Sequence, residues 1–211
     1  MRDYLIVMAV TIAATAAAVP PLRALSRRVG AMARPSDRSV HAKPTPLLGG
    51  AALFVGVLAG FVTAALLPGF RLVFEAPLNV VGVVVAAAVM FCTGLVDDIR
   101  DVSPPAKLAG MVLSGSVLTL VGITVIYFRV PFLGFTVLPP DLAALVSVVW
   151  VVILANAVNQ IDGLDGLAAG TCAISLLTFL AIAAISWIRS GEVGLRSDNY
   201  LDVAIFTAAL L

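Results

Sequence analysis

The sequence has little charge. Asp, Glu, Lys and Arg make up 12% of its 211 residues, there is one histidine, and the formal net charge is +1. Hydrophobic residues make up 61%, and the mean hydropathy is +1.11. This composition excludes a soluble domain, and the small net charge excludes the basic surface with which proteins bind nucleic acid. We therefore expect a multi-pass membrane protein whose partners include membrane lipid and no nucleic acid.

Cysteine is also scarce. Cys92 and Cys172 both lie within apolar runs, where a small buried side chain is a simpler interpretation than a disulfide framework. They indicate nothing about the redox compartment.

Long apolar runs take the place of charge. A helix needs about 20 residues to cross the hydrocarbon core, and six runs roughly meet this length, at 4–21, 47–67, 77–96, 106–127, 141–158 and 167–188. A seventh run opens near Tyr200 and stops at Leu211 after about half a span. The runs lack the polar alternation of barrel strands. We expect one all-α domain over 1–211, a polytopic transmembrane helix bundle of about six complete spans plus a truncated seventh, hence a fragment.

Basic residues favour one orientation of these spans. Loops 22–46, 97–107 and 156–166 carry eight of the Lys and Arg residues, and the N-terminus and the alternate loops carry five. Cytoplasmic loops are enriched in Lys and Arg. The first set is therefore expected to face the cytoplasm, with the N-terminus outside the cell (inner or plasma) membrane.

Acidic residues cluster after two of the runs: Asp97, Asp98 and Asp101 after the third, Asp162 and Asp165 after the fifth. An ionised Asp at the centre of a membrane helix costs about 2.5–3.5 kcal/mol on insertion scales. These acids therefore need water, a cation or the membrane edge. In the expected orientation all five lie on the cytoplasmic side, as does the single histidine.

The first acidic segment, GLVDDIRD at 94–101, is followed by two prolines and a lysine. The prolines indicate that a helix ends here and the chain turns at the membrane interface. Adjacent carboxylates repel unless a cation lies nearby, and Mg²⁺ prefers oxygen ligands, so Asp97 and Asp98 favour a metal or phosphate site. A solvated loop, in which Arg100 and Lys107 offset the acids, explains the segment equally well.

The second segment is NAVNQIDGLDGL at 156–167. If it is helical, Asn156, Asn159 and Asp162 are spaced by three residues and share one face. The glycines that follow would let the backbone leave the helix and approach a ligand closely. A helix-ending turn capped by Asn and Asp is the alternative, but capping does not need four polar side chains.

The third segment, DRSVHAKPTPLLGG at 37–50, places basic residues before a proline-rich turn and a glycine pair. Such a segment can surround an anionic ligand, which is the interpretation we favour for His41, Lys43 and Thr45. The arginines between 23 and 34 more simply fix the topology or contact anionic lipid.

Together the three segments resemble the polyprenyl-phosphate N-acetylhexosamine-1-phosphate transferase family, of glycosyltransferase 4 type. The family's Arg, His, Pro-Thr-Pro and Gly-Gly pattern is met by Arg38, His41, 44–46 and 49–50, and its Asp pair by Asp97 and Asp98. Its Asn-x-x-Asn-x-x-Asp-Gly-x-Asp-Gly pattern is met without a break over 156–166. The Pro-Thr-Pro form is more similar to the undecaprenyl-phosphate N-acetylglucosamine-1-phosphate branch than to the phospho-N-acetylmuramoyl-pentapeptide branch.

The resemblance implies a reaction. A polyprenyl phosphate, undecaprenyl or decaprenyl, would attack the β-phosphate of a UDP-N-acetylhexosamine, releasing UMP and leaving a polyprenyl-diphosphate sugar for cell-envelope polysaccharide synthesis. It also implies Mg²⁺, with Mn²⁺ as a substitute, and is compatible with a homodimer.

The resemblance also implies the site residues: catalytic Asp97, Asp98 and Asp162; metal-binding Asn159 and Asp98; substrate-binding His41, Lys43, Thr45, Lys107 and Asn156. Lys107 would hold a phosphate, and either acid of the pair could take the proton of the lipid phosphate. Asp101 and Asp165 are the weakest candidates.

Two departures from the family pattern matter. Leu47 follows the Pro-Thr-Pro where many relatives carry a basic residue. This difference weakens the prediction that the loop contacts the nucleotide. A Gly-Asp segment that shares the metal and a histidine-rich loop would lie beyond Leu211. We therefore expect the 211-residue chain by itself to be inactive.

Two other functions stay open. An ion-coupled transporter also carries intramembrane acids beside broken helices, but it needs them near the bilayer midplane. A non-catalytic remnant would keep the surface that binds lipid phosphate without transferring a sugar.

Overall fold

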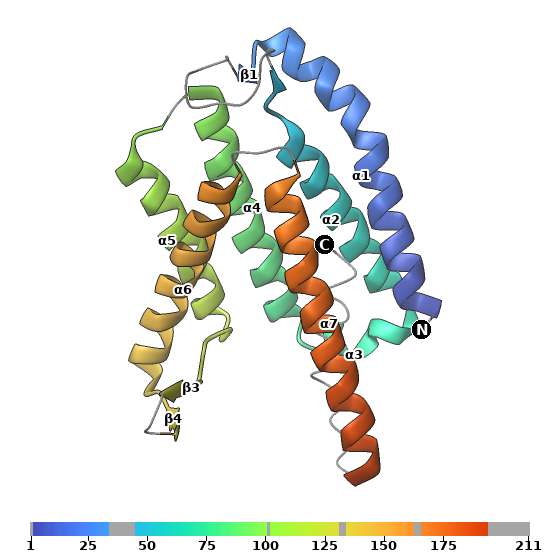
Figure 1. Cartoon of the computed structure of the whole chain (residues 1–211), viewed down its shortest axis with the longest axis vertical. Helices are drawn as coiled ribbons and strands as arrows, with labels where there is room; N and C mark the ends of the chain where they lie inside the picture. Colours follow the sequence, from blue (N-terminus) through green and yellow to red (C-terminus); the bar gives the residue numbers. More distant parts are fainter. Residues whose placement is uncertain (1, 34–44, 101, 131–133, 163–165, 194–211) are drawn as a thin grey trace. The chain divides into compact units, whose positions relative to one another are not determined.

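The computed structural model describes residues 2–33, 45–100, 102–130, 134–162 and 166–193 (Figure 1). Its helices are α1 (Arg2–Val29), α2 (Gly49–Leu66), α3 (Arg71–Phe74), α4 (Pro77–Arg100), α5 (Pro104–Leu120), α6 (Pro140–Ile161) and α7 (Leu167–Val193), with a 3₁₀ turn, η1, at Pro68–Phe70. Two short antiparallel strand pairs join β1 (Met32–Ala33) to β2 (Thr45–Pro46) and β3 (Tyr127–Val130) to β4 (Gly134–Val137). The all-α prediction is confirmed, although it did not include the strand pairs.

The chain divides into two compact units. The first comprises Met1–Ala76 and Ile161–Leu211, and the second comprises Pro77–Gln160. Each is described below by itself, and a single domain over 1–211 stays a prediction.

Four of the described helices, α1, α2, α4 and α6, are long and apolar enough to cross a membrane. They coincide with the expected spans at 4–21, 47–67, 77–96 and 141–158. The expected span at 167–188 falls within α7, whose segment Leu167–Phe179 is a shorter apolar helix. The run from Tyr200 lies outside the described residues, so the number of spans stays a prediction.

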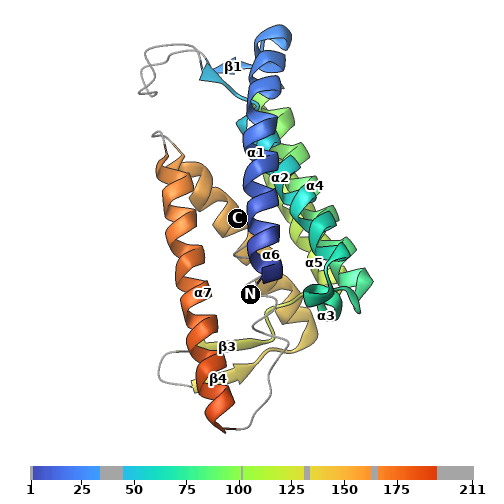
Figure 2. The same cartoon turned by 90° about the vertical axis from the view of Figure 1, so that its right-hand side faces the viewer.

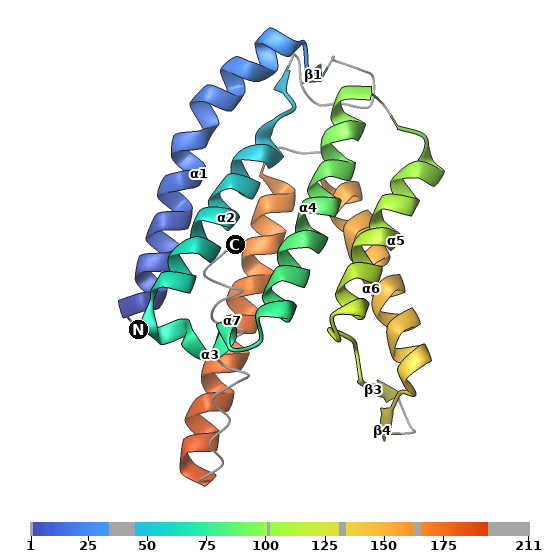
Figure 3. The ribbon, with the colours of Figure 1, turned by 180° about the vertical axis from the view of Figure 1, so that it is seen from behind.

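In the first unit, α1 and α2 lie side by side (Figures 1 and 3). The buried residues of α2 recur every four positions: Ala52, Gly56, Gly60 and Ala64. They therefore share one face. A Cβ atom on Gly56 would overlap Thr15 Oγ1 and lie 3.0 Å from the Thr11 carbonyl oxygen of α1. Small side chains thus let the two backbones approach closely, as is usual where helices associate within lipid.

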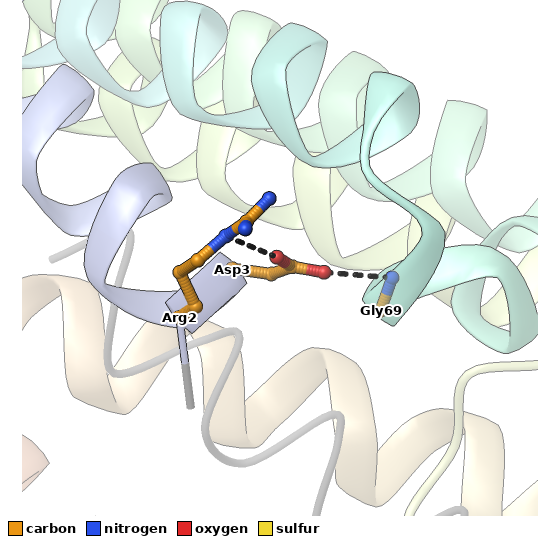
Figure 4. A network of polar contacts seen from close by, with 3 residues as sticks. All are labelled: Arg2, Asp3 and Gly69. Carbon is orange, nitrogen blue, oxygen red and sulfur yellow. Dashed lines mark hydrogen bonds and ion pairs between the residues drawn. The ribbon is translucent and has the colours of Figure 1, made fainter.

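The N-terminal end of α1 is tied to the turn that follows α2. The rings of Tyr4 and the fully buried Phe70 meet edge to face, with centroids 4.8 Å apart. Beside them Gly69 N donates a hydrogen bond to Asp3 Oδ2 at 3.0 Å, and Arg2 Nε lies 4.0 Å from Asp3 Oδ1 (Figure 4). The carboxylate thus satisfies a backbone amide at the end of the helix pair.

The other end of α1 positions the first loop. Gly30 has φ +73° and Ala31 N donates to Ser26 O at 3.0 Å, which is the hydrogen bond of a Schellman motif. The buried Ser26 hydroxyl donates to the Ala31 carbonyl. β1 then pairs with β2, with Ala33 opposite Thr45. The two ends of the intervening loop are therefore held together beside the beginning of α2.

In the second unit, α4 and α5 lie antiparallel (Figure 3). A Cβ atom on Gly110 of α5 would overlap the Thr93 side chain of α4. Further along, Ser114 Oγ donates to the Ala86 carbonyl oxygen at 2.8 Å. Because the two helices run in opposite directions, the last turn of α4 lies beside the first turn of α5.

The helix α5 ends earlier than the run at 106–127 predicts. Gly122 has φ +83°, Gly122 N donates to Thr119 O and Ile123 N donates to Leu118 O, both at 3.0 Å. These are the two bonds of a Schellman motif, which glycine permits without steric cost. The remainder of the run leads into β3, whose pairing with β4 lies at the start of α6 (Figure 2). Residues 121–126 of the expected span therefore form a turn and an irregular segment, and only Tyr127 belongs to β3.

Candidate functional site

The turn between α4 and α5 is organised by one carboxylate. Asp97, in the last turn of α4, accepts a hydrogen bond on Oδ1 from Val102 N at 3.1 Å. The Ser103 carbonyl then accepts hydrogen bonds from Ala106 N and Lys107 N, and α5 begins with the two prolines that follow Ser103. Proline is favoured at the first positions of a helix because its missing N–H would have no partner there. The turn expected from these prolines is present, and Asp97 holds it closed.

The same carboxylate forms an ion pair with a lysine. Lys107 Nζ lies 2.7 Å from Asp97 Oδ1, and the two side chains are 35% and 23% exposed. An ion pair this open to water contributes about 1 kcal/mol or less. The lysine is therefore positioned by the acid without being locked to it, and a stronger anion can replace the carboxylate as its partner.

Asp98 lies one residue further along α4 and is exposed. Successive residues of a helix point about 100° apart, so the two adjacent acids do not share one direction. Arg100 is exposed in the same last turn. Asp101 lies outside the described residues.

The second segment is carried by the C-terminal end of α6. Asn156 Nδ2 donates to the Val152 carbonyl oxygen at 2.8 Å and approaches Met111 Sδ of α5 at 3.3 Å. A carbonyl oxygen only accepts, so the atom that faces Val152 must be the amide nitrogen. Both amide hydrogens then have partners, and the exposed side chain presents its oxygen Oδ1 as an acceptor.

These contacts place the α4–α5 turn and the end of α6 at one end of the second unit. A Cβ atom on Gly115 of α5 would lie 3.1 Å from Val148 Cα of α6, and Met111 meets Asn156. The helices α5 and α6 are therefore antiparallel. Lys107 lies four residues before Met111 on α5, about 6 Å along the helix axis, and Asn159 lies three residues after Asn156 on α6, about 4.5 Å along its axis. Because the two helices are antiparallel, both residues are displaced toward the same end of the unit. The β3–β4 pair lies at the opposite end (Figure 3).

The helix α6 ends at Ile161, so Asp162 is the first residue beyond it and is exposed. Asn156 and Asn159 share a face of α6 as expected, whereas Asp162 lies beyond the end of that helix and is not part of the face. Gly166, with φ +76°, precedes α7 in a left-handed conformation that glycine adopts without steric cost. The intervening Asp165 lies outside the described residues.

The first loop is described only at its ends. Thr45 is half-buried in β2, whereas His41 and Lys43 lie outside the described residues. Thr45 and Asp162 belong to the first unit, and Asp97, Asp98, Lys107, Asn156 and Asn159 belong to the second. The second unit thus carries five of the expected residues toward one of its ends.

Within the described ranges, no three His, Cys, Asp or Glu side chains gather as a ready metal site. The oxygen donors at this end of the second unit include the carboxylates of Asp97 and Asp98 and the amide oxygens of Asn156 and Asn159. Mg²⁺ is usually bound by one or two carboxylates together with water and substrate phosphates. The donor set therefore fits Mg²⁺ as an ion that arrives with a phosphate ligand.

Comparison with known proteins identifies the family. The sequence profile of glycosyl transferase family 4 matches residues 80–211, which include both acidic segments and leave out the first loop. The chain belongs to glycosyl transferase family 4.

Curated relatives in this family cover nearly the whole chain. A decaprenyl-phosphate N-acetylglucosaminephosphotransferase of Mycobacterium tuberculosis (strain H37Rv) is 36% identical over 92% of the chain, and its namesake in Mycolicibacterium smegmatis 34% over 90%. A Bacillus subtilis protein named "Probable undecaprenyl-phosphate N-acetylglucosaminyl 1-phosphate transferase" is 32% identical over 88%. The chain spans about half the length of these relatives, 46%, 45% and 48%. No solved structure gives a significant match.

As a glycosyl transferase family 4 chain with four span-length helices, the protein is a multi-pass membrane protein. The resemblance drawn from the three sequence segments is confirmed at the level of the family. The segments did not reveal Met111, which contacts Asn156. Met111 lies four residues after Lys107 on α5, and this helical spacing is the sequence signal that could have pointed to it.

Proposed function

We propose that this glycosyl transferase family 4 chain takes part in transferring N-acetylglucosamine-1-phosphate from UDP-N-acetylglucosamine to a polyprenyl phosphate, undecaprenyl or decaprenyl, at the cytoplasmic membrane face. The printed names of the relatives support this substrate pair. The observation that carries the proposal is the end of the second unit where the Asp97–Lys107 pair and the two asparagines of α6 lie at similar levels.

Lys107 is proposed to bind a substrate phosphate. Its ammonium rests against Asp97 in a weak, partly exposed pair. A phosphate monoester carries about 1.5 to 2 negative charges near neutral pH, so it attracts the ammonium more strongly than one carboxylate does. The hydrogen bond from Val102 N keeps the turn closed when the lysine changes partner.

The two adjacent acids are proposed to have different roles. Asp97 already accepts two hydrogen bonds on one oxygen, from a backbone amide and from the lysine. That engagement suits a positioning role. Asp98 is exposed at the same helix end, and we assign it the proton of the lipid phosphate and, with Asn159, the metal ion.

Asn156 is proposed to present an acceptor to the donor substrate. With both amide hydrogens directed at Val152 and Met111, Oδ1 can accept a hydrogen bond or contact a cation, and it cannot donate to a phosphate oxygen. This favours an N–H or O–H group of the nucleotide-sugar, or the metal shell. Mg²⁺, when bound, supplies neutralisation of the diphosphate charge.

The proposed reaction balances as a phosphoryl substitution. A lipid-phosphate oxygen forms a bond to the β-phosphorus of the UDP-sugar, and the bond from that phosphorus to the bridging oxygen breaks. The bridging oxygen leaves with UMP, while the lipid keeps a diphosphate that carries the sugar. The protein's own part is to hold the two phosphates in line and to take one proton.

An ion-coupled transporter is the competing function. It places acids near the bilayer midplane, in the middle of broken helices. Asp97 and Asp98 instead occupy the last turn of α4, and Asp162 follows the last residue of α6. Acids at helix ends suit a site that is open to a soluble nucleotide and to a lipid head group.

A radiolabel transfer assay on the complete gene product tests the proposal. Purified protein with Mg²⁺, decaprenyl phosphate and labelled UDP-N-acetylglucosamine should form organic-soluble label and UMP. Asp98→Asn should reduce the rate at least about 100-fold, as for loss of a general base. Asp141→Asn, which removes an acid from the first turn of α6 at the opposite end, should stay within about twofold. Equal losses, or no lipid-linked product from the wild type, would overturn the assignment.

A further inference from the structure

A small hollow lies in the first unit where the C-terminal half of α1 meets β2 and the beginning of α2. Its volume is about 110 Å³. Val19, Leu22 and Arg23 line it from α1, and they lie on one helix face because they are spaced by three and four residues. Thr45 and Gly49 contribute from the other side. The upper part of α1 and the beginning of α2 in Figure 1 mark the place.

The lining combines apolar surface with one positive charge. Among the described residues that form the hollow, Arg23 is the single charged side chain, and the others are apolar, glycine or threonine. Arg23 is exposed and is the first charged residue after the apolar run of α1. A charge at this position lies where a membrane helix leaves the hydrocarbon for the head groups, whose phosphates attract Arg and Lys.

We propose that this hollow binds the head-group phosphate of one anionic phospholipid, such as phosphatidylglycerol. Arg23 contacts the phosphate, and the lipid chains extend along the apolar surface of α1 that begins at Leu22 and Val19. A volume of about 110 Å³ accommodates a compact head group and not a whole lipid. Thr45, predicted from the sequence to bind substrate, also lines the hollow, so the acceptor lipid phosphate is tested as a competing occupant.

The charge of the described lining matches a phosphodiester more closely than a phosphate monoester. A phosphodiester carries one negative charge, which a single guanidinium balances. A monoester, such as the polyprenyl phosphate or free phosphate, carries about 1.5 to 2 charges near neutral pH and would need a second cation. The described lining supplies only Arg23. All of these ligands present negatively charged phosphate oxygens, so the experiment must distinguish which of them occupies the hollow.

Native mass spectrometry of the 211-residue chain in detergent measures this binding. Dioleoyl phosphatidylglycerol is titrated, and the affinity of the first lipid adduct is compared with that of dioleoyl phosphatidylcholine. The wild type should bind the first phosphatidylglycerol about fivefold more tightly, the equivalent of about 1 kcal/mol for one basic residue near lipid charge. Decaprenyl phosphate and inorganic phosphate, added at equal concentration, should not displace it.

Two matched pairs of variants locate the lipid. Arg23→Gln should lose the fivefold preference, whereas Arg28→Gln, which removes an exposed charge outside the lining, should keep it. Gly49→Leu adds bulk at the hollow and should also lose it, whereas Gly50→Leu should not. A Cβ atom at either glycine meets nothing within 4 Å, so both variants are expected to fold.

The outcomes separate the alternatives. Equal losses for the two arginine variants, or no loss for Gly49→Leu, would reduce the binding to diffuse attraction and overturn the proposal. Displacement by decaprenyl phosphate would assign the hollow to the acceptor lipid, and displacement by inorganic phosphate alone would make it a free-phosphate site. The competition measurements use the wild type, so they decide the matter even if a variant misfolds.

Discussion

Replacing Lys107 with glutamine separates a structural role of the lysine from a functional one. Its ion pair with Asp97 spans 2.7 Å, with side chains 35% and 23% exposed. A pair this exposed contributes no more than about 1 kcal/mol to stability, equivalent to about 2–4 °C in melting temperature for a chain of this size. The hydrogen bond from Val102 N to Asp97 stays in place. Lys107→Gln should therefore fold almost as stably as the wild type.

The effect on transfer should be much larger. If Lys107 holds a substrate phosphate in the transition state, its loss removes a charge-assisted donor in a site with few other cations. Losses of such donors cost about 10²–10³ in kcat. The assay is the transfer of labelled N-acetylglucosamine-1-phosphate to decaprenyl phosphate by the complete gene product, with the melting temperature of the same preparation recorded in detergent.

Arg100→Gln is the control for this prediction. It removes the same charge from an exposed residue in the last turn of α4, and the rate should stay within about threefold. If the two variants lose activity equally, Lys107 acts only through the net charge of the turn. If Lys107→Gln unfolds the protein, the ion pair is structural and the reasoning fails.

Other contacts give further predictions. Met111→Leu conserves side-chain volume but removes the sulfur that accepts a hydrogen bond from Asn156. Activity should fall about fivefold, the equivalent of about 1 kcal/mol. The loss should come mainly from a higher KM for the UDP-sugar, and the melting temperature should stay unchanged. Gly56→Leu should destabilise the α1–α2 pair by about 2 kcal/mol or more through overpacking, whereas Gly50→Leu should leave the melting temperature unchanged. Ser26→Ala should cost about 1 kcal/mol because the Ala31 carbonyl loses the buried hydroxyl but keeps Leu47 N as a donor.

Most of the helices were predictable because a membrane-spanning segment is recognised in a sequence by its length and hydrophobicity. That criterion failed at 106–127, where it counted β-branched and aromatic residues as helix although Gly122 lies among them. A glycine that adopts φ +83° ends the helix at Leu120, and the chain continues without regular structure until strand β3 begins at Tyr127. Hydrophobicity alone does not locate the end of a helix within an apolar run.

The site was predictable where it depends on local spacing. Asp97 and Lys107 flank one short turn, so their pairing follows from the prolines that bring α5 back along α4. The contact between Asn156 and Met111 joins residues 45 positions apart and depends on how α5 and α6 pack. No pattern along the chain encodes that packing. The orientation of the Asn156 amide therefore required the structure.

Isotope exchange tests the central claim most directly. Radiolabelled UMP, UDP-N-acetylglucosamine, Mg²⁺ and decaprenyl phosphate are incubated with the complete gene product, and label is counted in the UDP-sugar. The proposed reaction predicts that label enters the UDP-sugar in the presence of both the lipid phosphate and the metal, and that Lys107→Gln abolishes nearly all of it. Absence of label in the wild-type reaction, with both present, would contradict a phospho-sugar transfer that releases UMP.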